Sequence, residues 1–73
     1  MIKSAITGKQ YDQGEAIYIT NPVQCFRYLD YLGPEFFLDI LYTGEKRKDA
    51  LVYVWKRCPE TKKAKELWDA HEL

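Results

Sequence analysis

The organisation of the chain is decided by the stretch Ala16-Ile17-Tyr18-Ile19-Thr20-Asn21-Pro22-Val23-Gln24. Its first half alternates side chains with the period of two that is typical of a β-strand. Its second half is a helix start, because Asn can cap the first turn, Pro fits the first helical position, and Gln24 can return the capping bond. We therefore expect a short strand that leads directly into a helix.

The first helix should end at Leu32. Gly33 can adopt the left-handed conformation that follows many helices, and Pro34 cannot continue one. Helical spacing then predicts an apolar stripe that faces the core and consists of Cys25, Phe26, Leu29 and Leu32.

The second half of the chain is typical of a β-hairpin followed by another helix. Residues 36–43 and 50–56 are rich in aromatic and β-branched side chains and are joined by a polar loop that contains Gly44. The helix should begin at Cys58 or Pro59, with an apolar side formed by Ala64, Leu67, Trp68 and His71. Residues 1–15 are either an extra edge strand or a loose N-terminal segment.

These elements predict one α+β domain over residues 1–73. We expect a small antiparallel sheet of three to four strands with two helices packed on one face, in the order (β)-β-α-β-β-α. A chain of 73 residues is near the lower limit for independent folding, so its core must be dense or shared with a partner.

Both faces of the predicted hairpin are apolar. Simple alternation places Phe36, Leu38, Ile40, Val52 and Val54 on one face, and Phe37, Leu41, Leu51, Tyr53 and Trp55 on the other. One face takes the helices. We expect the other to be an aromatic interface rich in Tyr18, Phe37, Tyr53 and Trp55, used most simply in a symmetric homodimer; the alternative is that residues 1–15 fold back over it.

The net charge does not favour binding to nucleic acid or to a membrane surface, because eleven basic and eleven acidic residues balance. Residues 44–65 nevertheless contain eight basic residues against three acidic ones, a local excess that either binds a partner or simply solvates the surface. No apolar run is long enough to span a bilayer and Met1 begins no secretory signal, so we expect a cytoplasmic protein that does not bind membranes.

Residues for catalysis or metal binding are scarce. Ser4 is the only serine and His71 the only histidine. Cys25, Cys58 and His71 have ligand types that suit zinc, but Cys58 and His71 should lie about 20 Å apart along one helix. We expect no enzyme activity, no metal and no cofactor.

Two binding functions remain. Protein binding is favoured, because tyrosine, tryptophan and arginine around an apolar centre dominate interface energies. The alternative is a small nucleic-acid-binding module in which aromatic side chains stack on bases and the basic hairpin holds phosphates. The partner-binding residues predicted from both are Tyr18, Phe37, Tyr53, Trp55, Lys46, Arg47 and Lys48.

A family resemblance points the same way. Four segments carry the resemblance: Ile17 to Cys25, Leu38-Asp39-Ile40-Leu41, Leu51-Val52-Tyr53-Val54-Trp55 and Thr61 to Trp68. Together they resemble small uncharacterised proteins from phages and mobile elements of Gram-positive bacteria, over residues 16–73. The resemblance implies an accessory protein that binds a host protein, in a class that includes inhibitors of bacterial defence effectors such as anti-CRISPR proteins. The resemblance also implies that the protein acts in the cytoplasm of a bacterial host cell, and that its partner is a host protein of the kind that handles nucleic acids.

Overall fold

The computed structural model describes residues 1–42 and 51–73. The strands are β1 (Ile2–Lys3), β2 (Gln10–Tyr11), β3 (Ala16–Ile19), β4 (Phe37–Tyr42) and β5 (Leu51–Lys56). The helices are α1 (Pro22–Leu32) and α2 (Pro59–Asp69), with short 3-10 turns at η1 (Gln13–Glu15) and η2 (Pro34–Phe36). The predicted α+β class and the order of the main elements are confirmed.

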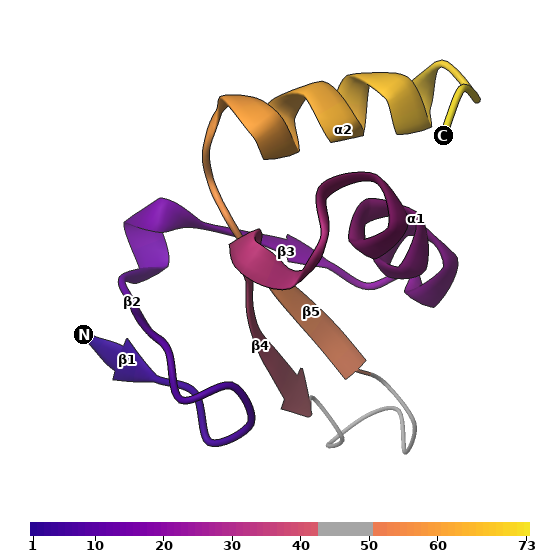
Figure 1. The fold of residues 1–73 in the computed structure, drawn as a ribbon. Coiled ribbons are helices and arrows are strands. Elements are labelled where there is room, and N and C mark those ends of the chain that lie inside the picture. The colour runs from indigo at the N-terminus through magenta and orange to yellow at the C-terminus, as the bar shows by residue number, and fades with distance from the viewer. Residues whose placement is uncertain (43–50) are drawn as a thin grey trace.

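The main sheet has the strand order β3-β5-β4 and is antiparallel throughout, while β1 and β2 pair separately. Both helices lie on one side of this sheet, and the β1-β2 segment lies away from them (Figure 1). Neighbouring residues of β5 show the two sides: Trp55 packs with α1 and α2, whereas Val54 packs with Tyr11 of β2. The expectation of two helices on one face is therefore confirmed.

Helix α1 begins and ends as predicted. The Asn21 side-chain oxygen accepts the backbone N–H of Val23 at 2.9 Å and that of Gln24 at 3.4 Å. At the other end Gly33 has φ of 77°, and its N–H donates to the Leu29 carbonyl at 2.8 Å. The Gln24 side chain donates to the Tyr28 hydroxyl at 3.0 Å instead of returning the capping bond.

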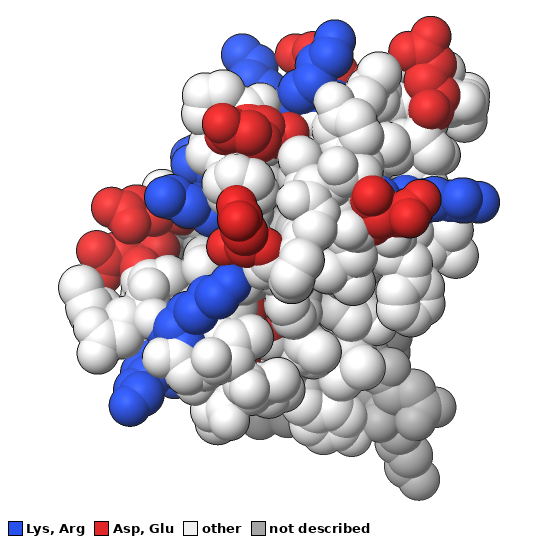
Figure 2. Space-filling view, in the orientation of Figure 1, with Lys and Arg blue, Asp and Glu red and all other residues white. Residues whose placement is uncertain are grey.

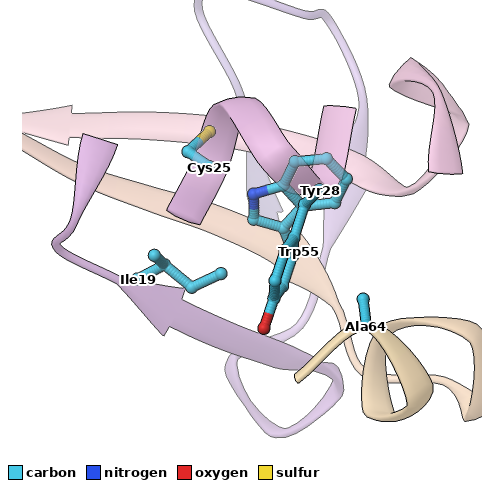
Figure 3. Close-up of a cluster of buried hydrophobic side chains, with 5 residues drawn as sticks. All are labelled: Ile19, Cys25, Tyr28, Trp55 and Ala64. Atoms are coloured by element: carbon cyan, nitrogen blue, oxygen red, sulfur yellow. The ribbon is translucent and has the colours of Figure 1, made fainter. Parts of the chain in front are cut away.

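The predicted apolar stripe of α1 is wrong in one position. Phe26 is 63% exposed, and its place in the core is taken by Tyr28, which is fully buried. Each residue rotates the helix by about 100°, so an arc centred on Cys25, Leu29 and Leu32 includes position 28 and excludes position 26. In the core Tyr28 meets Trp55 edge-on, with ring centroids 5.5 Å apart (Figure 3).

Helix α2 begins at Pro59, as expected, and its first turn is closed by Thr61. The Thr61 hydroxyl accepts the Cys58 N–H at 3.1 Å and donates to the Lys56 carbonyl at 2.6 Å. Ala64 is buried against Trp55, and Trp68 packs beside this cluster. His71 does not belong to the apolar side, because the helix ends at Asp69 and His71 is exposed with φ of 59°.

A β-bulge between Phe37 and Asp39 changes the predicted faces of β4. Leu38 and Asp39 are both buried and both contact the Tyr11 side of the sheet. The extra residue shifts the alternation, so Ile40 lies opposite Tyr53 on the helix side rather than beside Leu38. Simple alternation holds along β5 and fails along β4.

Candidate functional site

Residues 1–15 cover the sheet face opposite the helices. Tyr11 is buried against Leu38 and Val54, with Ile2 packed alongside. From the sequence, residues 1–15 were either an extra edge strand or a loose segment. In the structure they form two short paired strands, β1 and β2, that fold back over the sheet. The chain's own N-terminal segment therefore covers the sheet face that the helices leave open. This is the face of Leu38 and Val54, and not the aromatic face that we expected to be the interface.

A buried carboxylate fixes this segment in place. Asp39 is 4% exposed; it accepts the Ser4 hydroxyl at 2.7 Å and the Tyr11 hydroxyl at 2.8 Å. The Asp39 carboxylate also accepts the Ile40 N–H at 2.8 Å. We call Ser4, Tyr11 and Asp39 the Asp39 cluster. Its donors are neutral, so hydrogen bonds rather than a salt bridge compensate for burial of the carboxylate.

The electrostatics of the Asp39 cluster suit a structural role. Burial, together with the hydrogen bond to Asp39, raises the pKa of Tyr11 to about 12. Ser4 is buried, and its oxygen accepts the N–H groups of Ile6 and Thr7, so a substrate cannot reach the hydroxyl in this conformation. Outside the cluster the Lys9 ammonium donates to the carbonyls of residues 34, 35 and 37 at 2.9, 3.1 and 2.9 Å.

The predicted aromatic interface is not formed. Trp55 is fully buried, which corrects the expectation that it is exposed, because both helices pack on the side of β5 that carries it. Phe37 lies against Trp55 with ring centroids 5.3 Å apart, and Tyr53 is half-buried on the same face. Tyr18 is exposed but pairs with Val54, so it belongs to the opposite face.

Burial of Trp55 removes the aromatic surface on which the nucleic-acid hypothesis placed the stacked bases. Trp55 cannot stack on a base unless the core opens. Lys46, Arg47 and Lys48, which were to hold phosphates, lie outside the described residues. Sequence reasoning misassigned Trp55 because alternation identifies two apolar faces but does not say which one the helices cover.

No metal centre is visible in the described part of the chain. Within residues 1–42 and 51–73, no three residues among His, Cys, Asp and Glu are grouped closely enough to hold an ion. Cys25 is a free buried thiol, and burial raises its pKa, with a smaller opposing effect of Trp55. Cys58 is a free, half-buried thiol at the start of α2.

An exposed apolar surface lies elsewhere, at residues that sequence reasoning did not select. Val23 and Phe26 project from α1, and Tyr42 and Leu51 form the last pair of β4 and β5. We call these four residues the apolar surface. In Figure 2 the side of the molecule where α1 begins and β4 ends shows a broad uncharged area, whereas charged groups are interspersed over α2 and the N-terminal segment. A finer helical wheel for α1 would have found Phe26.

Comparison with known proteins adds no function. No protein-family model, curated protein or solved structure matches the chain. Neither helix of the described residues is long and apolar enough to cross a membrane.

Proposed function

We propose that the chain is a non-enzymatic protein-binding module and that the apolar surface is its contact site. The observation that carries the proposal is Phe26, a large apolar side chain that is 63% exposed in the middle of α1. Large exposed apolar groups that lie together on an otherwise charged surface commonly mark a protein interface. The resemblance to phage and mobile-element proteins suggests a host protein, such as a defence effector, as the partner.

The arrangement of the apolar surface supports binding rather than accidental exposure. Val23 and Phe26 are one helical turn apart, and Tyr42 and Leu51 are directly opposite each other across the hairpin. Arg27 and Asp30 follow on the outer side of α1 and could supply the polar rim of an interface. An apolar centre with a polar rim is the usual anatomy of a protein contact.

The test compares two exposed positions of α1. Phe26→Ser removes the central aromatic, and Asp30→Ser removes an exposed carboxylate on the same helix. Because both side chains are exposed, both variants should melt within about 2 °C of wild type. Cross-linking in host cells identifies the partner, and titration calorimetry with the purified partner should give a Kd at least about 30-fold weaker for Phe26→Ser only.

Three results would contradict the proposal. The first is a partner whose affinity is the same for wild type and Phe26→Ser. The second is a salt-insensitive homodimer, measured by light scattering, that Phe26→Ser dissociates, because self-association would then explain the surface. The third is turnover of a nucleic acid by the pure, metal-free protein, because a non-enzymatic role would then be wrong.

A further inference from the structure

The edge of strand β3 carries an unused row of backbone groups. In the strand order β3-β5-β4, β3 has a neighbour on one side only. The Arg57 N–H donates to the Glu15 carbonyl, and this pair sets the alternation of hydrogen bonds between β3 and β5. The backbone N–H and C=O groups of Ile17 and Ile19 therefore bond to β5, whereas those of Tyr18 point to the free edge. Among the described residues these two groups have no hydrogen-bond partner.

A groove runs along this edge, between β3 and α2. One hollow of about 470 Å³ is lined by Ile17 and by the first turn of α2, including Pro59 and Lys62. A second hollow of about 300 Å³ is lined by residues 17–20 and by the later part of α2, including Trp68. Both hollows share Ile17 and Lys65, so they lie side by side along the edge, and we call the two together the β3 groove.

The two ends of the β3 groove differ in charge. Arg57 and Lys62 line the first hollow, and within the described residues neither makes a salt bridge. Lys65 is already paired with Asp69 at 2.8 Å, so the later part of the groove is close to neutral. The floor of the first hollow is mainly apolar, with Ile17 and Pro59. An occupant that matches this end carries an apolar side chain beside an acidic one.

We infer that the β3 groove binds an extended acidic segment of a partner protein by strand addition. The segment would pair with the outward N–H and C=O of Tyr18, place an apolar side chain over Ile17 and Pro59, and bring a carboxylate to Arg57 and Lys62. Backbone hydrogen bonds to a free strand edge supply affinity, and side-chain hollows at alternate positions supply specificity. This site is separate from the apolar surface and does not depend on it.

A second copy of this chain fits the groove less well. In a symmetric antiparallel pairing of two β3 strands about Tyr18, the end next to Arg57 would meet Thr20 and Asn21 of the other copy, which carry no charge. Arg57 would then gain no carboxylate from the paired strand of the second copy, whereas an acidic segment supplies one. Charge complementarity therefore selects an acidic segment.

The experiment selects the ligand and then tests how it binds. Short random peptides are displayed and panned on the full chain, and a synthetic peptide of the enriched sequence is titrated by fluorescence anisotropy. Two further versions carry methyl groups on the backbone nitrogens of alternate residues. Because only every second N–H of an added strand faces β3, one version should lose affinity by at least about tenfold and the other should bind within about threefold of the parent.

Protein variants test the charge. Arg57→Gln and Lys62→Gln should each weaken the acidic peptide by about three- to tenfold and reduce the salt dependence of binding. Lys63→Gln is the matched control, because Lys63 is an exposed lysine of the same helix that lines a different hollow. The enriched peptides should combine an acidic and an apolar residue at a fixed spacing.

Four results would overturn the inference. They are a selection with no binding above background, peptides without acidic residues, equal affinity of the two methylated versions, and a dimer that the selected peptide dissociates. The last would assign the groove to a second copy. Loss of peptide binding in Phe26→Ser would place the peptide on the apolar surface instead, so failure of this site and failure of the apolar surface are distinguishable.

Discussion

Replacement of Asp39 by alanine tests whether the buried carboxylate holds residues 1–15 on the sheet. The Asp39 carboxylate accepts hydrogen bonds from Ser4, Tyr11 and the Ile40 N–H. Hydrogen bonds to a charged group contribute roughly 1.5 kcal/mol each at the lower end, or about 4.5 kcal/mol for the three. Relief from burying a charge returns part of this amount, so we expect Asp39→Ala to cost about 3 kcal/mol.

Such a loss is large for this chain. A domain of this size has a total stability of about 4 to 11 kcal/mol. Urea unfolding followed by tryptophan fluorescence measures the change, because Trp55 is fully buried and reports on the core. Asp30→Ala is the control, since Asp30 is an exposed carboxylate of α1, and it should stay within about 0.5 kcal/mol of wild type.

The reasoning would be refuted by an Asp39→Ala variant within about 0.5 kcal/mol of wild type. That result would mean that the carboxylate does not bind residues 1–15 in solution. If Asp39→Ala does not fold, Ser4→Ala provides a milder measurement, because it removes one of the three donors and should cost about 1 to 2 kcal/mol.

Three further predictions concern single side chains. Because the folded-state pKa of Tyr11 is raised to about 12, the neutral phenol stabilises the fold fully below pH 10, and this contribution is lost as pH rises through 12; Tyr11→Phe should flatten that part of the stability–pH profile, and equal slopes would contradict the assignment. Thr61→Val should lower the stability measured by urea unfolding by about 1 to 2 kcal/mol, because it removes the hydroxyl that closes the first turn of α2. His71→Gly should increase the free energy of unfolding by about 0.5 to 1 kcal/mol and raise the melting temperature, because His71 has φ of 59°. A lower melting temperature would show that the His71 side chain stabilises the fold.

Local signals predicted the elements of the fold correctly. Asn21-Pro22 started α1, Gly33-Pro34 ended it, and Cys58-Pro59 started α2, because capping and proline geometry depend on a few adjacent residues. The same locality explains the failures. The Asp39 cluster joins residues separated by 28 and 35 positions, and no short window of sequence contains both partners. Asp39 in the middle of an apolar strand was a signal of a buried polar contact.

The candidate sites were harder to predict than the elements. Whether Trp55 is buried depends on which face of the sheet the helices cover, and both faces were apolar. The bulge at Asp39 then reversed the alternation along the rest of β4. The β3 groove could not be predicted either, because the free edge of a strand can be identified only when the strand order of the sheet is known. None of these properties is contained in the period of a single strand.

The arrangement of layers restricts where a partner can bind. The helices cover one face of the main sheet and residues 1–15 cover the other, so in the described part of the chain the free edge of β3 and the outer side of α1 remain accessible. The β3 groove lies at one edge of the sheet, whereas Tyr42 lies on β4 at the other edge. Sites that share no contacts and lie more than about 7 to 10 Å apart are usually independent energetically. We therefore expect saturation of the β3 groove with its peptide to change affinity for a partner at the apolar surface by less than about twofold, which calorimetry can measure; a larger change would show that the two surfaces bind one continuous partner or are coupled through the sheet.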